Sequence, residues 1–128
     1  MRELDNSALK LLELEGPAAI EVSITFVDDD TITALHEKYR KKKGPTDVLS
    51  FELSGPGEKP LLGDIYISMD RVIHQAKSFR ISRKEEALRL LVHGLLHLCG
   101  YRDDTVKRRE KMFRVQESFV SDYLTGSL

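Results

Sequence analysis

The residues best suited to chemistry lie between His93 and Asp103, in the segment HGLLHLCGYRD. His93 and His97 are four residues apart, and residues i and i+4 share one face of an α-helix, so both imidazoles can reach the same point. Gly100 follows, and glycine readily adopts the left-handed conformation in which helices commonly end. The chain can then turn back and carry Asp103 to that point. Two imidazoles, one carboxylate and an open fourth position are typical of a catalytic zinc site.

Two histidines on a leucine-rich helix can also be half-buried residues that hydrogen-bond to the backbone. Residues 87–99 are apolar nearly all round, so imidazoles buried there need specific partners, which favours the metal site. Gly94 inside this helix costs about 1 kcal/mol relative to alanine, which indicates that another segment approaches the helix backbone closely. Gly94 also occupies the position of the glutamate base in the zincin motif H-E-x-x-H, and this disfavours a metallopeptidase.

The histidine segment resembles the signature of the YbeY family of rRNA maturation factors, H-G-x-L-H-L-x-G-Y-D-H. Two further blocks resemble the family in the same order: Tyr39-Arg40 followed by PTDVLSF at residues 45–51, and LGDIYIS at residues 62–68. The resemblance implies a metal-dependent endoribonuclease that acts in ribosomal RNA processing, notably at the 3′ end of the small-subunit RNA, and in ribosome quality control. It also implies ribosomal RNA and the small ribosomal subunit as partners.

The chain departs from the family pattern at Arg102-Asp103, where the signature has Asp-His. We expect His93, His97 and Asp103 to bind one Zn²⁺, or another divalent transition metal, because two histidines and one carboxylate form an established catalytic set. Aspartate is shorter than histidine, so the turn before Asp103 must come closer to the two imidazoles. Asp104 takes the place of Asp103 if the register shifts by one residue. The alternative is a degenerate metal site in a non-catalytic, ribosome-associated RNA-binding factor.

Positive charge is concentrated in three segments, although the formal net charge is −1. Arg40 is the candidate catalytic residue, because its planar guanidinium matches phosphate oxygens and can stabilise charge that develops on the phosphoryl group. Lys41, Lys42 and Lys43 follow it directly and are candidate substrate-binding residues. The alternative for each basic run is a solvated surface. The other two basic segments comprise Arg80, Arg83 and Lys84, and Lys107, Arg108, Arg109, Lys111 and Arg114.

Several other polar residues are predicted to have ordinary structural roles. Asp47, Ser50 and Asp64 lie in the matched blocks, where hydrogen bonds that hold the cleft together are the favoured explanation. His36 and His74 have no ligand spacing and are expected to be surface or boundary residues. Cys99 lies two positions from His97, on a different side of the helix, and is expected to pack in the core.

The pattern along the chain predicts an α+β fold in a single domain of residues 1–128, with a mixed sheet of three to four strands and about five helices. Asp28 to Asp30 are expected to cap a helix whose Ile32, Leu35 and Tyr39 line one side. Ser82 to Glu85 form a capping box before the histidine helix. The expected strands are 20–26, 48–53 and 61–68, the last two joined as an antiparallel hairpin, and the expected helices include 4–12, 70–79 and 105–123.

The sequence contains no long apolar span, and Met1 is followed directly by charged residues. We therefore expect a cytoplasmic protein that neither enters a membrane nor carries an export leader. The single cysteine agrees with a reducing compartment.

Overall fold

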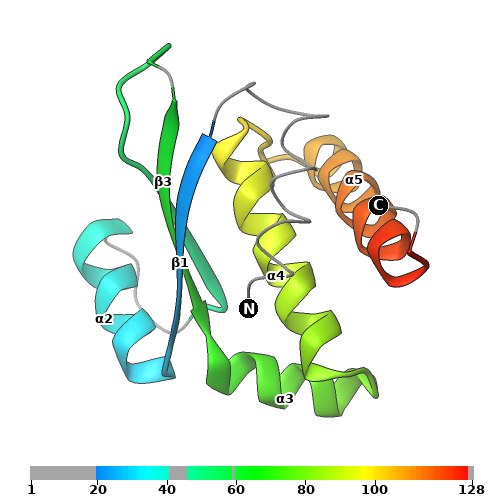
Figure 1. The fold of residues 1–128 in the computed structure, drawn as a ribbon. Helices are drawn as coiled ribbons and strands as arrows, with labels where there is room; N and C mark the ends of the chain where they lie inside the picture. The colour runs from blue at the N-terminus through cyan, green and yellow to red at the C-terminus, as the bar shows by residue number, and fades with distance from the viewer. Residues whose placement is uncertain (1–19, 41–45, 59, 127–128) are drawn as a thin grey trace.

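The computed structural model describes residues 20–40, 46–58 and 60–126 (Figure 1). The expected helix over residues 4–12 and the three lysines at 41–43 lie outside the described residues. The described elements are β1 (Ile20–Val27), α2 (Asp29–Arg40), β2 (Val48–Glu52), β3 (Leu61–Ser68), α3 (Met69–Phe79), α4 (Arg83–Leu98) and α5 (Val106–Leu124). They confirm the predicted α+β class.

The three described strands form one mixed sheet in the order β1-β3-β2. β3 runs parallel to β1 and antiparallel to β2, which confirms the predicted hairpin. Ile65 and Ile67 of the central strand are fully buried. On β1 the half-buried residues Val22, Ile24 and Phe26 alternate with exposed ones, so only one face of this strand packs against the core.

Helix α4 is the centre of the core and lies between the sheet and α5 (Figure 1). Its N-terminus is capped as predicted, because Ser82 Oγ accepts a hydrogen bond from the Glu85 backbone N–H at 3.0 Å. Helix α5 covers the other side of α4. None of the helices in the described part of the chain is long and apolar enough to cross a membrane. The most deeply buried side chains of these two helices include Leu88, Leu91, Leu95, Leu96, Met112 and Val120.

Helix α2 covers the opposite side of the sheet from α4 (Figure 1). Asp28 caps it by accepting a hydrogen bond from the Thr31 backbone N–H at 2.7 Å, and Ile32 is fully buried. Tyr39, predicted to lie on the same side of the helix, is 57% exposed. The Tyr39 ring meets the Phe51 ring of β2 in an edge-to-face arrangement, with 5.6 Å between ring centroids.

Candidate metal centre

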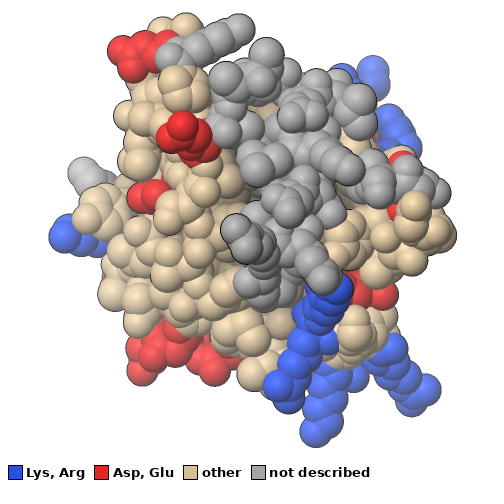
Figure 2. Space-filling view, viewed as in Figure 1, with Lys and Arg blue, Asp and Glu red and all other residues tan. Residues whose placement is uncertain are grey.

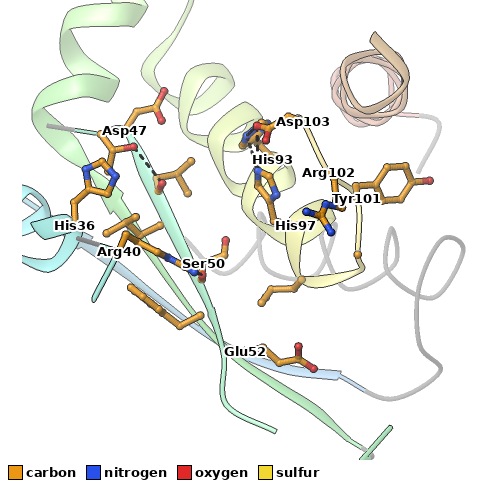
Figure 3. A pocket seen from close by; sticks show the side chains of 16 residues that line it. His36, Arg40, Asp47, Ser50, Glu52, His93, His97, Tyr101, Arg102 and Asp103 are labelled. Atoms are coloured by element: carbon orange, nitrogen blue, oxygen red, sulfur yellow. Dashed lines mark hydrogen bonds and ion pairs between the residues drawn. The ribbon is translucent and has the colours of Figure 1, made fainter. Parts of the chain in front are cut away.

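Helix α4 and the turn after it bring His93, His97 and Asp103 together (Figure 3). The two Nε2 atoms are 3.1 Å apart. Asp103 Oδ2 lies 3.5 Å from His97 Nε2 and 3.8 Å from His93 Nε2. Asp104 does not take this place, because its carboxylate pairs with Arg108 at 2.9 Å and with Arg102 at 3.3 Å.

The turn depends on Gly100, which has a φ of +95°. Helix α4 ends at Leu98, and the next turn is closed by hydrogen bonds from the Gly100 N–H to the His97 carbonyl and from the Tyr101 N–H to the Leu96 carbonyl, both 3.0 Å. A positive φ is accessible to glycine without a Cβ clash, so the chain reverses here and Asp103 returns to the end of the helix.

The three side chains fit a divalent ion. Zinc ligands at about 2.0–2.2 Å in a tetrahedral arrangement lie about 3.3–3.6 Å from one another. The observed separations of 3.1, 3.5 and 3.8 Å fall around that range. The side chains are between 31% and 46% exposed. A metal held here would therefore keep an open position toward solvent, as catalytic zinc sites do.

The surroundings of His97 favour its neutral imidazole form. Burial lowers the pKa of His97, and the neighbouring imidazole of His93 and the guanidinium of Arg40 lower it further, while Asp103 and a hydrogen bond with the Tyr101 backbone oppose the change. The lowered pKa favours the neutral imidazole, which is the species that coordinates a metal.

His93 has a partner on α5 that was not predicted from the sequence. Its Nδ1 lies 2.8 Å from Oε1 of Gln116, whose side chain is buried. Gln116 lies four residues after Met112 and four before Val120, two buried core residues. A glutamine in the middle of an apolar helical stripe is the signal that could have revealed it.

Gly94 allows the sheet to approach the helix, as the sequence predicted. Ser50 Oγ donates a hydrogen bond of 2.9 Å to the Gly94 carbonyl oxygen. A Cβ at position 94 would lie only 2.8 Å from that Oγ and 3.2 Å from Cγ2 of Ile65. Ser50 therefore joins β2 to α4 directly beside His93, the structural role expected for it.

A cleft of about 1070 Å³ runs along β2, between the end of α2 and the end of α4. In Figure 3, Arg40 lies across this cleft from the two histidines. Its guanidinium donates a hydrogen bond to the Ser50 carbonyl oxygen and lies 4.8 Å from the Phe51 ring centroid. The other polar residues that line the cleft include His36, Thr46, Asp47, Glu52 and Arg102.

The sequence of this chain matches a family of known proteins. The family model described as Endoribonuclease YbeY matches residues 1–124. The chain belongs to the YbeY family. Endoribonuclease YbeY of Bacillus subtilis is 40% identical over 134 residues, which cover 96% of this chain and 85% of that protein. The Aquifex aeolicus protein of the same name is 42% identical over 110 residues, or 85% of this chain and 73% of that protein.

A solved structure agrees with the fold of this YbeY-family chain. The solution structure of TM1509 from Thermotoga maritima superposes with a TM-score of 0.66 at 28% identity, and the match covers 94% of this chain and 79% of that one.

The remaining predicted residues of this YbeY-family chain fall inside and outside the cleft. His36, expected to be an ordinary surface or boundary residue, is half-buried and lines the cleft, which its spacing gave no reason to expect. His74 is exposed on α3, as expected. Cys99 is half-buried against the core cluster. Asp64 pairs with Phe51 in the sheet and does not line the described part of the cleft.

The two described basic segments lie at different distances from the candidate metal site. Lys107–Arg114 belongs to the first half of α5, where Arg109 Nη1 lies 3.4 Å from the Asp103 carbonyl oxygen. Arg80, Arg83 and Lys84 are exposed where α3 meets α4, and Figure 2 shows basic side chains gathered on that side of the molecule. His97 is fourteen positions after Arg83 in α4, about 21 Å along the helix axis, so this segment is remote from the cleft.

Proposed function

We propose that this chain is a metal-dependent endoribonuclease that cleaves ribosomal RNA precursors in the cytoplasm, at the 3′ end of the small-subunit RNA, and takes part in ribosome quality control. One observation carries the proposal: His93 Nε2, His97 Nε2 and Asp103 Oδ2 converge beside an open cleft. Family membership supports it, because relatives about 40% identical are named Endoribonuclease YbeY.

In this proposal His93, His97 and Asp103 hold one Zn²⁺. A divalent ion there would polarise a phosphoryl oxygen of the RNA and favour deprotonation of the attacking hydroxyl, whether from water or from the RNA 2′-OH. The protein's own contribution is to hold two neutral imidazoles and one carboxylate in a fixed arrangement at the end of α4. The lowered pKa of His97 keeps that ring ready to bind.

Arg40 is proposed to bind the scissile phosphate from the opposite side of the cleft. The Phe51 ring beneath its guanidinium and the Ser50 carbonyl at one nitrogen hold the side chain in place. A guanidinium has five N–H donors in a planar fork, so donors remain for two phosphate oxygens. Lys41, Lys42 and Lys43 are proposed to bind the neighbouring phosphates, since they directly follow Arg40 in the sequence.

One observation favours a second candidate function. Asp103 is 46% exposed, the most exposed of the three proposed ligands. A weakly held metal would leave a non-catalytic RNA-binding factor that acts on the ribosome. This alternative shares the fold and the basic residues with the first proposal but predicts no RNA cleavage.

Metal content and cleavage test the proposal together. Protein purified without chelators is expected to contain about one zinc per chain and to cleave an rRNA fragment that spans the small-subunit 3′ end. Zinc at a hundred times its dissociation constant should stabilise the fold by about 2.7 kcal/mol. His97→Ala should abolish the stabilisation and the cleavage, whereas His74→Ala, an exposed histidine on α3, should change neither.

Two results would contradict the proposal. Equal zinc stabilisation of His97→Ala and wild type would mean that the metal binds elsewhere. Zinc and RNA binding without any cleavage by wild type would favour the non-catalytic alternative.

A further inference from the structure

A series of hydrogen bonds leads from His93 into the interface between α4 and α5. His93 Nδ1 lies 2.8 Å from Gln116 Oε1, and Gln116 Nε2 donates to Glu117 Oε2 at 3.1 Å. Gln116 is only 6% exposed. A buried amide oxygen in this position acts as a fixed hydrogen-bond acceptor for the histidine ring.

Glu117 is itself held by Arg89 of α4. Arg89 Nε and Nη2 both donate to the Glu117 carboxylate at 2.9 Å, and Arg89 Nη1 donates to Glu85 at 3.2 Å. Burial raises the pKa of Glu117, but the hydrogen bonds from Arg89 and Gln116 outweigh it, so the net pKa is lowered. Glu117 is therefore a charged acceptor at neutral pH, and bidentate pairs of this kind have a defined geometry.

The carboxylate determines which way the Gln116 amide faces. An amide group has donors on nitrogen and acceptors on oxygen only. If the amide of Gln116 were rotated by half a turn, its oxygen would lie about 3 Å from the Glu117 carboxylate, and two acceptors would repel each other. The nitrogen therefore faces Glu117, and the oxygen faces His93.

An amide oxygen can only accept, so the Nδ1 of His93 must carry the hydrogen. In a neutral imidazole the other nitrogen then has the lone pair. That nitrogen, Nε2, is the atom that lies 3.1 Å from His97 Nε2 and 3.8 Å from Asp103 Oδ2. The orientation of Gln116 thus decides which nitrogen of His93 faces the candidate metal centre.

We propose that Gln116, oriented by the Arg89–Glu117 ion pair, is a positioning residue that holds His93 in the Nδ1–H tautomer and presents Nε2 to the metal. The proposal rests on the proposed function only in naming a metal as the partner of Nε2. The tautomer itself is a property of the metal-free protein. Partners of this kind on metal-binding histidines commonly change metal affinity by about 10- to 100-fold.

Histidine tautomers can be measured directly in metal-free protein. With ¹⁵N-labelled histidine, long-range ¹H–¹⁵N correlation spectra above pH 7.5 should show His93 as the Nδ1–H tautomer. Gln116→Met, which keeps the side-chain length and removes the acceptor, should abolish this preference and weaken zinc binding by about 10- to 100-fold in a chelator competition. The matched control is Gln75→Met, the same change at a half-buried glutamine of α3, and it should change neither measurement.

A second variant keeps the test valid if Gln116→Met does not fold. Glu117→Gln leaves Gln116 in place but removes the charge that orients it, so His93 should show a mixture of tautomers and a smaller loss of zinc affinity. An Nε2–H tautomer in the wild type, or an unchanged tautomer in both Gln116→Met and Glu117→Gln, would overturn the proposal. If the tautomer changes as expected but the wild type binds no zinc, the positioning role stands and the proposed metal-dependent function fails.

Discussion

Replacing Gly94 with alanine tests the close packing of α4 against the sheet. The added Cβ would lie 2.8 Å from Ser50 Oγ and 3.2 Å from both Ile65 Cγ2 and Val48 Cγ2. All three separations are shorter than ordinary van der Waals contact, and overpacking of this kind costs about 1–3 kcal/mol. Alanine regains about 1 kcal/mol of helix propensity. We therefore expect Gly94→Ala to lower the free energy of unfolding by about 1 kcal/mol, and by about 2 kcal/mol at most.

Urea unfolding followed by circular dichroism measures this change, and Ser50→Ala completes a double-mutant cycle. Ser50 Oγ would make the shortest contact with the new methyl group and donates to the Gly94 carbonyl oxygen at 2.9 Å. Loss of that hydrogen bond alone should cost about 1 kcal/mol. Gly94→Ala should cost less in the Ser50→Ala protein than in wild type, because the shortest contact is gone.

Two outcomes would count against this reasoning. A Gly94→Ala protein more stable than the wild type by about 1 kcal/mol, the full gain in helix propensity, would refute the claim that α4 and the sheet are too close for a methyl group. The same cost in both backgrounds would assign the conflict to Ile65 and Val48 instead of Ser50.

Three further predictions concern the candidate site and the ion pair that supports it. Asp103→His should tighten zinc binding and Asp103→Ala should weaken it, and equal zinc affinity of wild type and Asp103→Ala in a chelator competition would exclude Asp103 as a ligand. Arg40→Ala should leave zinc affinity nearly unchanged but slow single-turnover RNA cleavage by roughly 100-fold, since its partner is the phosphate. The pKa of Glu117 is lowered in the fold from its ordinary value of 4.5. Its ionised form therefore stabilises the fold above about pH 4.5, and this contribution is lost as the pH falls through the lowered value. Glu117→Gln should be less stable than wild type at pH 7. The difference in their free energies of unfolding, measured with urea, should become smaller toward pH 3. A difference that does not change with pH would refute the role of ionisation.

The sequence predicted the geometry of the candidate metal centre where that geometry is local. The spacing of His93 and His97 sets their relative position within one helix, whatever the rest of the chain does. The return of Asp103 needed only one reversal, and Gly100 signalled it. The antiparallel hairpin of β2 and β3 was likewise predictable from the turn-rich segment between two strand patterns.

The parts that the sequence did not predict depend on packing between distant segments. Gln116 is 23 residues from its partner His93, and they meet only because α5 packs along α4. His36 reaches the cleft because α2 lies beside β2, a relation that no spacing in its own helix encodes. Tyr39 continues the predicted apolar side of α2, but how much of its ring is covered depends on Phe51 of β2, a contact between separate segments.

The contact between Arg40 and the Ser50 carbonyl also changes the edge of the sheet. β2 is an edge strand of the described sheet, and the N–H of Leu53, the residue after it, bonds to the Leu62 carbonyl oxygen of β3. Hydrogen-bonded pairs alternate along antiparallel strands, so the backbone groups of Ser50 point away from β3, toward the open edge. Unpaired edge groups can recruit a strand from another molecule, and a charged side chain on the edge opposes this. Arg40 occupies one of these acceptors, so the residue proposed to bind phosphate also places a positive charge on the edge of the strand that forms the cleft wall.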